Sequence, residues 1–197
     1  MNDMEDLVSQ MNTRDWQPSK GRTALLLIDL EEYFRDLIDP VLNNLLGVIE
    51  TARSRRIPLV FTRHRHLEGK DPGVLGKWWN DLIWEDTPEA QLLPELNVTP
   101  DEVVVEKDRY SAFHHTDLEN FLKKWAIRDV VIGGVMTNLC CETTAREAFV
   151  RDYRVFFLAD GTSTVSRDLH LSTLANLAYG FATLMTCAGF GRSLRNW

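Results

Sequence analysis

The residues of this chain best suited to catalysis are a carboxylate, an ammonium and a thiol: Asp29, Lys107 and Cys140. Cys140 follows an apolar run at 129–135, in what we predict to be the first turn of a helix. Free N–H groups and the helix dipole favour a thiolate there. Each residue alone has an ordinary structural explanation, as a turn former, a solvated charge or a small core residue. The hypothesis of a cysteine nucleophile therefore depends on whether the fold brings the three together.

Apolar runs alternate with amphipathic segments along the chain. Six runs have the length of buried strands: 23–29, 57–62, 102–106, 129–135, 153–159 and 182–186. Strands that alternate with helices indicate an α/β protein, in which a parallel sheet is covered on both faces to give three layers, α/β/α. Asp29 ends the first run, Lys107 follows the third and Cys140 follows the fourth. Because ligands bind outside the carboxyl ends of parallel strands, we expect all three at one edge of the sheet.

Composition and charge limit the class of protein. The length of 197 residues and the hydrophobic content of 44% suit a single domain over residues 1–197, with residues 1–22 as a polar lead segment. The net charge of −7 argues against nucleic acid or an anionic membrane as a partner. No apolar stretch is long enough to span a bilayer, and the acidic N-terminus lacks the apolar core of a signal peptide. Three cysteines, two of them adjacent, do not make a disulfide framework, so we expect a reduced, cytoplasmic setting.

The motifs around the three residues resemble those of a known family, the isochorismatase-like cysteine hydrolases. The resemblance begins at about residue 23, and the segments that carry it are Leu27-Ile-Asp29 with Tyr33-Phe34, Lys107 with Tyr110-Ser-Ala-Phe113, and Gly134-Val-Met-Thr-Asn-Leu-Cys140. It implies a Rossmann-like, six-stranded, mainly parallel sheet with strand order 3-2-1-4-5-6. It also implies a catalytic triad of Asp29, Lys107 and Cys140. In that order Lys107 starts about two strand spacings, ~10 Å, from the centre, and its long side chain has to close the gap.

The resemblance further implies a cis peptide bond at Val135–Met136 and a homodimer or homotetramer. The expected reaction is hydrolysis of a small amide, ureide or carbamoyl compound through a thioester, with no cofactor. The backbone N–H groups of Met136 and Cys140 would stabilise the oxyanion. Large apolar side chains are the candidates for the walls of the substrate pocket: Phe34, Trp79, Phe113 and Met136. The long irregular segment 64–100, which carries three of the tryptophans, is also expected to be functional.

His64 and His66 follow the second strand and, by alternation, lie on one face. They could contact substrate or bind a metal. Nicotinamidases of the same family have an Asp-x-His pair and a later histidine here, whereas this chain has His64 in place of that aspartate and no further histidine until His114. The incomplete set favours substrate contact by His64, and we expect no metal. A substrate carboxylate would be bound by Arg63 or Arg65.

Two other functions remain open. An isochorismatase-type vinyl-ether hydrolase would resemble this chain but dispense with the cysteine, so Cys140 disfavours that interpretation. A non-catalytic α/β binding subunit would have a cysteine that reacts no faster than free cysteine. Of the remaining cysteines, Cys141 is turned by about 100° from Cys140 along a helix, so we expect it to pack in the core, as we do for Cys187. A dinucleotide-binding domain is disfavoured because no G-x-G-x-x-G motif follows the first strand.

Overall fold

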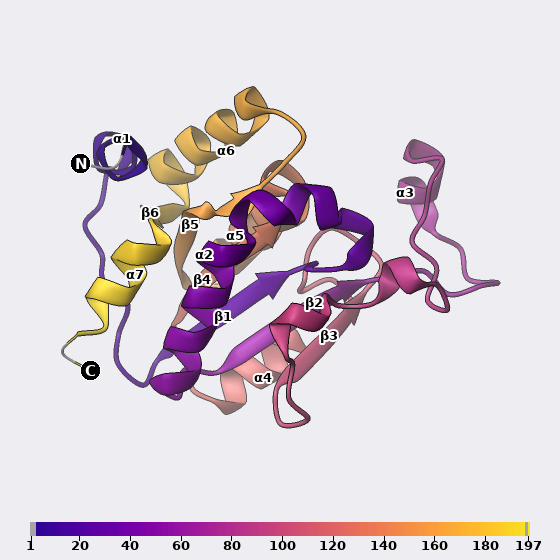
Figure 1. Ribbon diagram of the computed structural model, residues 1–197, viewed down its shortest axis with the longest axis horizontal. Helices are drawn as coiled ribbons and strands as arrows, with labels where there is room; N and C mark the ends of the chain where they lie inside the picture. Colours follow the sequence, from indigo (N-terminus) through magenta and orange to yellow (C-terminus); the bar gives the residue numbers. More distant parts are fainter. Residues whose placement is uncertain (1–2, 196) are drawn as a thin grey trace.

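The computed structural model describes residues 3–195 and 197, and a sheet of six parallel strands lies at its centre (Figure 1). The strand order is β3-β2-β1-β4-β5-β6, so the predicted order 3-2-1-4-5-6 is confirmed. The strands are β1 (Thr23–Ile28), β2 (Leu59–His64), β3 (Val103–Lys107), β4 (Asp129–Val135), β5 (Arg154–Ser163) and β6 (Ala182–Met185). Every neighbouring pair is parallel, as expected for strands joined by helical crossovers.

Helices cover both faces of the sheet, which confirms the three-layer architecture (Figure 1). They are α1 (Asp3–Met11), α2 (Arg35–Ser54), α3 (Gly73–Trp78), α4 (Leu118–Lys124), α5 (Glu142–Val150), α6 (Arg167–Gly180) and α7 (Cys187–Ser193). Alternate residues of β1 enter different cores, because successive side chains of a strand point to opposite faces. Leu25 and Leu27 pack with α2 and α7, whereas Leu26 and Ile28 pack with α4, α5 and α6. Within the described residues, no helix combines the length and the apolar character needed to cross a membrane.

The element boundaries differ from the prediction where they matter for the site. The lead segment is not irregular throughout, since it contains α1, which packs on α6 and β6 and buries Val8. β2 continues to His64, two residues beyond the predicted end, and β3 continues to Lys107. His64 and Lys107 are consequently register partners at the carboxyl ends of neighbouring strands.

The chain between β2 and β3 leaves the body of the protein beyond the carboxyl ends of the strands. Figure 1 shows α3 at that side of the molecule, apart from the helices that cover the sheet. An isolated β-bridge between Glu31 and Leu92 connects the segment to the body of the protein, and a second one, between His66 and Trp84, joins two parts of the segment itself. It is therefore placed to cover whatever lies at this edge of the sheet.

β4 approaches β1 so closely near its end that only glycine fits. Gly134 has a φ of +120°, and a Cβ atom built on it would lie 2.1 Å from the carbonyl oxygen of Ile28. Side chains other than hydrogen are excluded there by both the backbone angle and the contact. The next peptide bond, between Val135 and Met136, is cis and leads directly into the turn that carries Cys140.

Candidate functional site

Asp29 lies at the carboxyl end of β1, where the backbone changes direction. Its φ of +51° is in the left-handed region, which aspartate adopts more readily than most residues. Thr62 of β2 accepts a hydrogen bond from the Asp29 backbone N–H at 3.0 Å and donates its own proton to Asp29 Oδ1 at 2.6 Å. Both residues are fully buried. The Thr62 hydroxyl therefore orients the carboxylate from the neighbouring strand.

Lys107 reaches Asp29 from two strands away. Its Nζ lies 2.7 Å from Asp29 Oδ2, and both side chains are excluded from solvent. The same Nζ donates to the carbonyl oxygen of Arg109 at 3.0 Å and lies 3.5 Å from Cys140 Sγ. Burial disfavours the charged amine, but the charge and hydrogen bond of Asp29, together with the nearby Cys140 and Glu31, outweigh this effect and raise the pKa of Lys107. The long side chain thus closes the gap of two strand spacings, and its amino group is protonated when it contacts Asp29.

Cys140 lies in a π-helical turn, Thr137–Cys141, that joins β4 to α5. The prediction that Cys140 lies in the first turn of a helix is confirmed, but this turn is π-helical and α5 begins only at Glu142. Burial raises the pKa of Cys140; the Lys107 ammonium opposes this rise and the Asp29 carboxylate adds to it. The resting side chain is therefore a thiol and not the thiolate that the helix-dipole argument favoured. Its proton has to be taken by a base when the sulfur reacts, and Asp29 is the carboxylate within reach.

Met136 stands directly before this turn. Its carbonyl oxygen accepts hydrogen bonds from the backbone N–H groups of Leu139 at 3.1 Å and Cys141 at 3.2 Å. From the next strand connection, Thr164 donates its hydroxyl proton to Asn138 Oδ1 at 2.6 Å. The backbone around Cys140 is therefore held by hydrogen bonds within the turn and by one from Thr164 outside it. The expected roles of the Met136 and Cys140 N–H groups as oxyanion donors stay predictions.

His64 and His66 are buried side by side, with their Nε2 atoms 3.2 Å apart. His64 Nδ1 lies 3.2 Å from Lys107 Nζ. An ammonium can only donate, so this Nδ1 is an acceptor. Burial, assisted by the nearby Lys107 charge, lowers the pKa of His64, so the ring is neutral and carries its proton on Nε2. His64 Nε2–H then donates to His66 Nε2.

The donor groups at this edge do not fit a metal ion. Asp29, His64 and Cys140 offer possible ligand atoms that lie within 4.8 Å of one another. The Lys107 ammonium already contacts all three groups, at 2.7, 3.2 and 3.5 Å, and supplies the positive charge there. Both ring nitrogens of His64 are engaged, by Lys107 and by His66, so neither lone pair position is free for a metal.

A cavity of about 110 Å³ opens beside Cys140. Its walls on the body of the protein are mostly aromatic or apolar: Tyr33, Phe34, His64, Tyr110, Met136 and Leu139. The sequence predicted Phe34, His64 and Met136 as substrate contacts, and all three line the cavity. Phe113 does not line it. Its ring stacks on Tyr153 with centroids 6.1 Å apart and packs in the core, because the chain after β3 turns it toward α4 and α5.

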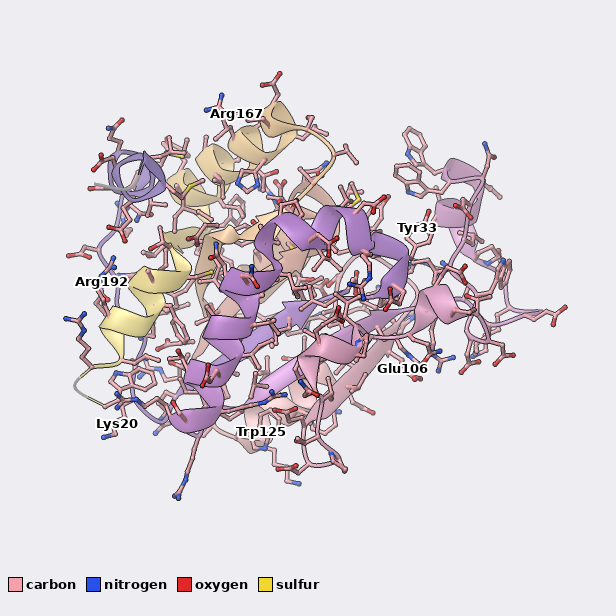
Figure 2. The ribbon with its side chains drawn as sticks, in the orientation of Figure 1. Lys20, Tyr33, Glu106, Trp125, Arg167 and Arg192 are labelled. Carbon is pink, nitrogen blue, oxygen red and sulfur yellow. The ribbon has the colours of Figure 1, made fainter. Side chains whose placement is uncertain are left out.

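The opposite wall of the cavity is the flap, which we define as residues 73–83, including α3. Its lining side chains are Leu75, Trp79, Asp81, Leu82 and Ile83. Two hydrogen bonds between side chains join it to the body: Trp79 Nε1 donates to Tyr110 Oη at 2.7 Å, and Tyr33 Oη donates to Asp81 Oδ2 at 3.0 Å. The backbone N–H of His66 also donates to the carbonyl oxygen of Ile83 at 2.8 Å. Figure 2 shows Tyr33 where the body faces this segment. Of the flap residues, only Trp79 was predicted to form a wall of the pocket. The length of the irregular segment 64–100 and its tryptophans were the sequence features that indicated a role for the others.

The remaining candidates of the sequence lie outside the cavity. Arg63 and Arg65 both pair with Glu106, which Figure 2 labels at the edge of the sheet, and Arg65 also pairs with Glu85. Neither arginine is among the described residues that line the cavity, so the expected binding of a substrate carboxylate by them has no geometric support. Cys141 and Cys187 are buried, one in each core, as expected.

The sequence shows to which protein family this chain belongs. A family model described as an isochorismatase domain matches residues 23–189, from the first residue of β1 into α7. The chain belongs to the isochorismatase family. The part of the chain that this family accounts for contains Asp29, Lys107, Cys140 and the whole flap.

Individual relatives within the isochorismatase family match over most of the chain. Nicotinamidase 3 of Arabidopsis thaliana is 45% identical over 185 residues, which cover 92% of this chain and 93% of that protein. Enterobactin synthase component B of Escherichia coli (strain K12) is 30% identical over 175 residues, covering 85% of this chain and 61% of that protein. The crystal structure of a cysteine hydrolase from Pseudomonas syringae pv. phaseolicola 1448A matches with a TM-score of 0.88 and 24% identity, over 91% of this chain and 95% of that chain. This last match is a likeness of fold.

Proposed function

We propose that this member of the isochorismatase family is an amidohydrolase that cleaves the C–N bond of a small carboxamide, with Cys140 as nucleophile and a thioester as intermediate. The observation that carries the proposal is one set of contacts: Lys107 Nζ lies 2.7 Å from Asp29 Oδ2 and 3.5 Å from Cys140 Sγ. The sulfur borders a cavity with mainly apolar walls, which suits a small, flat substrate. The 45% identity to a protein named a nicotinamidase makes nicotinamide the first compound to test, before ureides and carbamoyl compounds.

The first half of the proposed reaction forms the thioester. Cys140 Sγ attacks the carbonyl carbon while its proton passes to Asp29. Lys107 holds the carboxylate and stabilises the charge that develops on sulfur. The N–H groups of Met136 and Cys140 would stabilise the oxyanion, a contribution of ~3–4 kcal/mol for each such donor. The C–N bond breaks when Asp29 returns the proton to the leaving nitrogen.

The second half of the reaction releases the acid. Asp29 takes a proton from water as that water attacks the thioester carbonyl. The C–S bond then breaks, and the proton returns to the sulfur. Each proton is thereby taken up and returned by one buried carboxylate, which Thr62 and Lys107 hold in place.

The two alternative functions have less support. An isochorismatase-type vinyl-ether hydrolase needs no thiol, and its substrate carries carboxylates, for which no cation is found among the described residues that line the cavity. A purely binding subunit has no need of a buried lysine in contact with a carboxylate and a thiol at once. Removal of one partner from such a buried charge pair lowers protein stability by ~3–5 kcal/mol. A protein that only binds a ligand would gain nothing from this arrangement.

The experiment is ammonia release from nicotinamide by the unmodified protein, Cys140→Ala and Cys141→Ala. Cys141 is the matched control, because it is the adjacent cysteine but lines no part of the cavity. We expect Cys140→Ala to reduce the rate to background and Cys141→Ala to retain it. Hydroxylamine should intercept the thioester as a hydroxamate only when Cys140 is present. Full activity of Cys140→Ala would refute the proposal, and pyruvate release from isochorismate would favour the vinyl-ether alternative.

A further inference from the structure

The cavity beside Cys140 carries one formal charge among its described lining residues, and that charge is negative. It belongs to Asp81 of the flap. The other polar groups of the lining are neutral: the phenols of Tyr33 and Tyr110, the indole of Trp79, and His64, whose pKa is lowered mainly by burial. A ligand in a cavity of about 110 Å³ cannot lie far from any of its walls.

No lysine or arginine is among the described residues that line the cavity. The charge of Lys107 is matched by Asp29 at 2.7 Å, and its side chain is completely buried. Arg63 and Arg65 are engaged by acidic side chains outside the cavity. Arg109 does not line the cavity either, and it pairs with Asp108 at 3.3 Å. Among the described lining residues, the exposed Asp81 therefore carries the one formal charge that a ligand meets directly.

The carboxylate of Asp81 is also held in position. Tyr33 Oη donates to its Oδ2 at 3.0 Å, and this bond joins the flap to the body of the protein. A hydrogen bond to a carboxylate is stronger than one between neutral groups, so the Tyr33 hydroxyl is a suitable partner to hold this side chain in place. Figure 2 shows Tyr33 at the side of the body that faces the flap.

We propose that Asp81 determines specificity: it admits neutral or cationic carboxamides to the cavity and excludes anions, including the carboxylate that the reaction produces. The inference rests on the proposed amidohydrolase function and names its substrate class. Hydrolysis turns a neutral amide into a carboxylate anion at neutral pH, so one fixed negative charge both selects the substrate and weakens binding of the product. Substrates that carry their own carboxylate are poor ones for the same reason.

The test compares Asp81→Asn with the unmodified enzyme, because asparagine keeps the shape and an acceptor for Tyr33 while removing the charge. Nicotinamide is the substrate and nicotinate, its hydrolysis product, is the inhibitor. We expect the inhibition constant of nicotinate relative to the KM of nicotinamide to fall about three- to tenfold in Asp81→Asn, as for one charge at a partly solvated site. High salt should lower this ratio in the unmodified enzyme, because it screens the charge of Asp81, and should have little effect on the ratio in Asp81→Asn. Asp86→Asn is the matched control: it makes the same change of net charge at an exposed position outside the cavity, and its ratio should stay unchanged.

Failure of this inference can be told apart from failure of the proposed function. If nicotinamide is hydrolysed and the ratio is the same in Asp81→Asn as in the unmodified enzyme, the role of Asp81 is refuted and the amidohydrolase function stands. If no amide is hydrolysed, calorimetric binding of nicotinamide and nicotinate to the same proteins decides the matter. Nicotinate bound as tightly as nicotinamide by the unmodified protein, or no binding of either, would overturn the inference.

Discussion

A hydroxyl group, in addition to the lysine, orients the base of the proposed reaction. Thr62 makes two hydrogen bonds with Asp29, one to its backbone and one to its carboxylate, and all of these groups are buried. Replacement by valine keeps the shape of the side chain and removes both bonds. We expect Thr62→Val to lower kcat by about tenfold or more, since a hydrogen bond to a buried charge contributes roughly 1.5–3 kcal/mol. The measurement is steady-state kinetics on nicotinamide.

The control for this prediction is Thr62→Ser, which keeps the hydroxyl and loses only a methyl group. Its kcat should stay within a few-fold of the unmodified enzyme, while its stability falls slightly through the lost packing. Equal losses of kcat in the serine and valine variants would mean that the hydroxyl does not position Asp29. A fall in KM without a change in kcat would lead to the same conclusion.

At the scale of single residues, the sequence was sufficient to predict the three candidate catalytic groups but not the residues that position them. Asp29, Lys107 and Cys140 could be predicted because each follows an apolar run, and the ends of parallel strands meet at one edge. Thr62 is the last residue of the predicted run 57–62, where a β-branched residue looks like an ordinary part of a strand. Asp81 lies in an irregular segment, so only the tertiary contact with Tyr33 reveals its place beside the cavity.

Among the elements, the flap is the one whose position should control access to Cys140. Its bond from Trp79 to Tyr110 measures 2.7 Å, and Tyr110→Phe removes the acceptor while keeping the ring. We expect KM for nicotinamide to rise roughly fivefold, because one neutral hydrogen bond contributes about 1 kcal/mol to the closed position. The value of kcat should change less than KM, since no reacting group is altered. Tyr179→Phe at an exposed tyrosine is the control, and equal KM values in the two variants would contradict a closing role for this bond.

The strands were predictable as elements, whereas the π-helical form of the turn that carries Cys140 was not. Buried parallel strands appear as continuous apolar runs, and the predicted boundaries differ from the observed ones by only a few residues. The π-helical turn Thr137–Cys141 has no such signature, because it depends on the tight approach of Gly134 to β1 and on bonds from neighbouring segments. The assumed α-helical first turn led to the expectation of a thiolate. Burial reverses that expectation, since the surroundings of Cys140 are set by packing between distant parts of the chain.

For the molecule as a whole, three layers around one parallel sheet were predictable from the alternation of strands and helices. The association into a homodimer or homotetramer stays a prediction, which sedimentation of the purified protein would test. The position of Lys107 beside Asp29 was predictable although 78 positions separate them, because the strand order brings both to one edge of the sheet. The complete burial of Glu31 near Asp29 was not predictable, because it depends on packing between distant parts of the chain.

Glu31 makes the stability of the whole protein depend on pH. Burial, and then the charge of Asp29, raise the pKa of Glu31 well above its ordinary value, against the opposing effects of the His64 N–H, Lys107 and Arg63. The folded state therefore holds the Glu31 proton more tightly than the unfolded chain does. For such a group the stabilising contribution is complete below the unfolded pKa, about 4.3, and is lost as pH rises through the folded pKa.

Glu31→Gln should consequently gain stability relative to the unmodified protein as the pH rises. Glutamine reproduces the neutral side chain and its oxygen can still accept the bond from the His64 N–H. We expect the difference in Tm between variant and unmodified protein to shift by a few degrees in favour of the variant between pH 5 and pH 8. The lowered pKa values of His64 and His66 also make stability depend on pH, but they do so in both proteins, so their contribution cancels in the difference in Tm. Glu89→Gln, at an exposed glutamate, should show no such trend, and a pH-independent difference for Glu31→Gln would mean that Glu31 is ionised in the folded protein across this range.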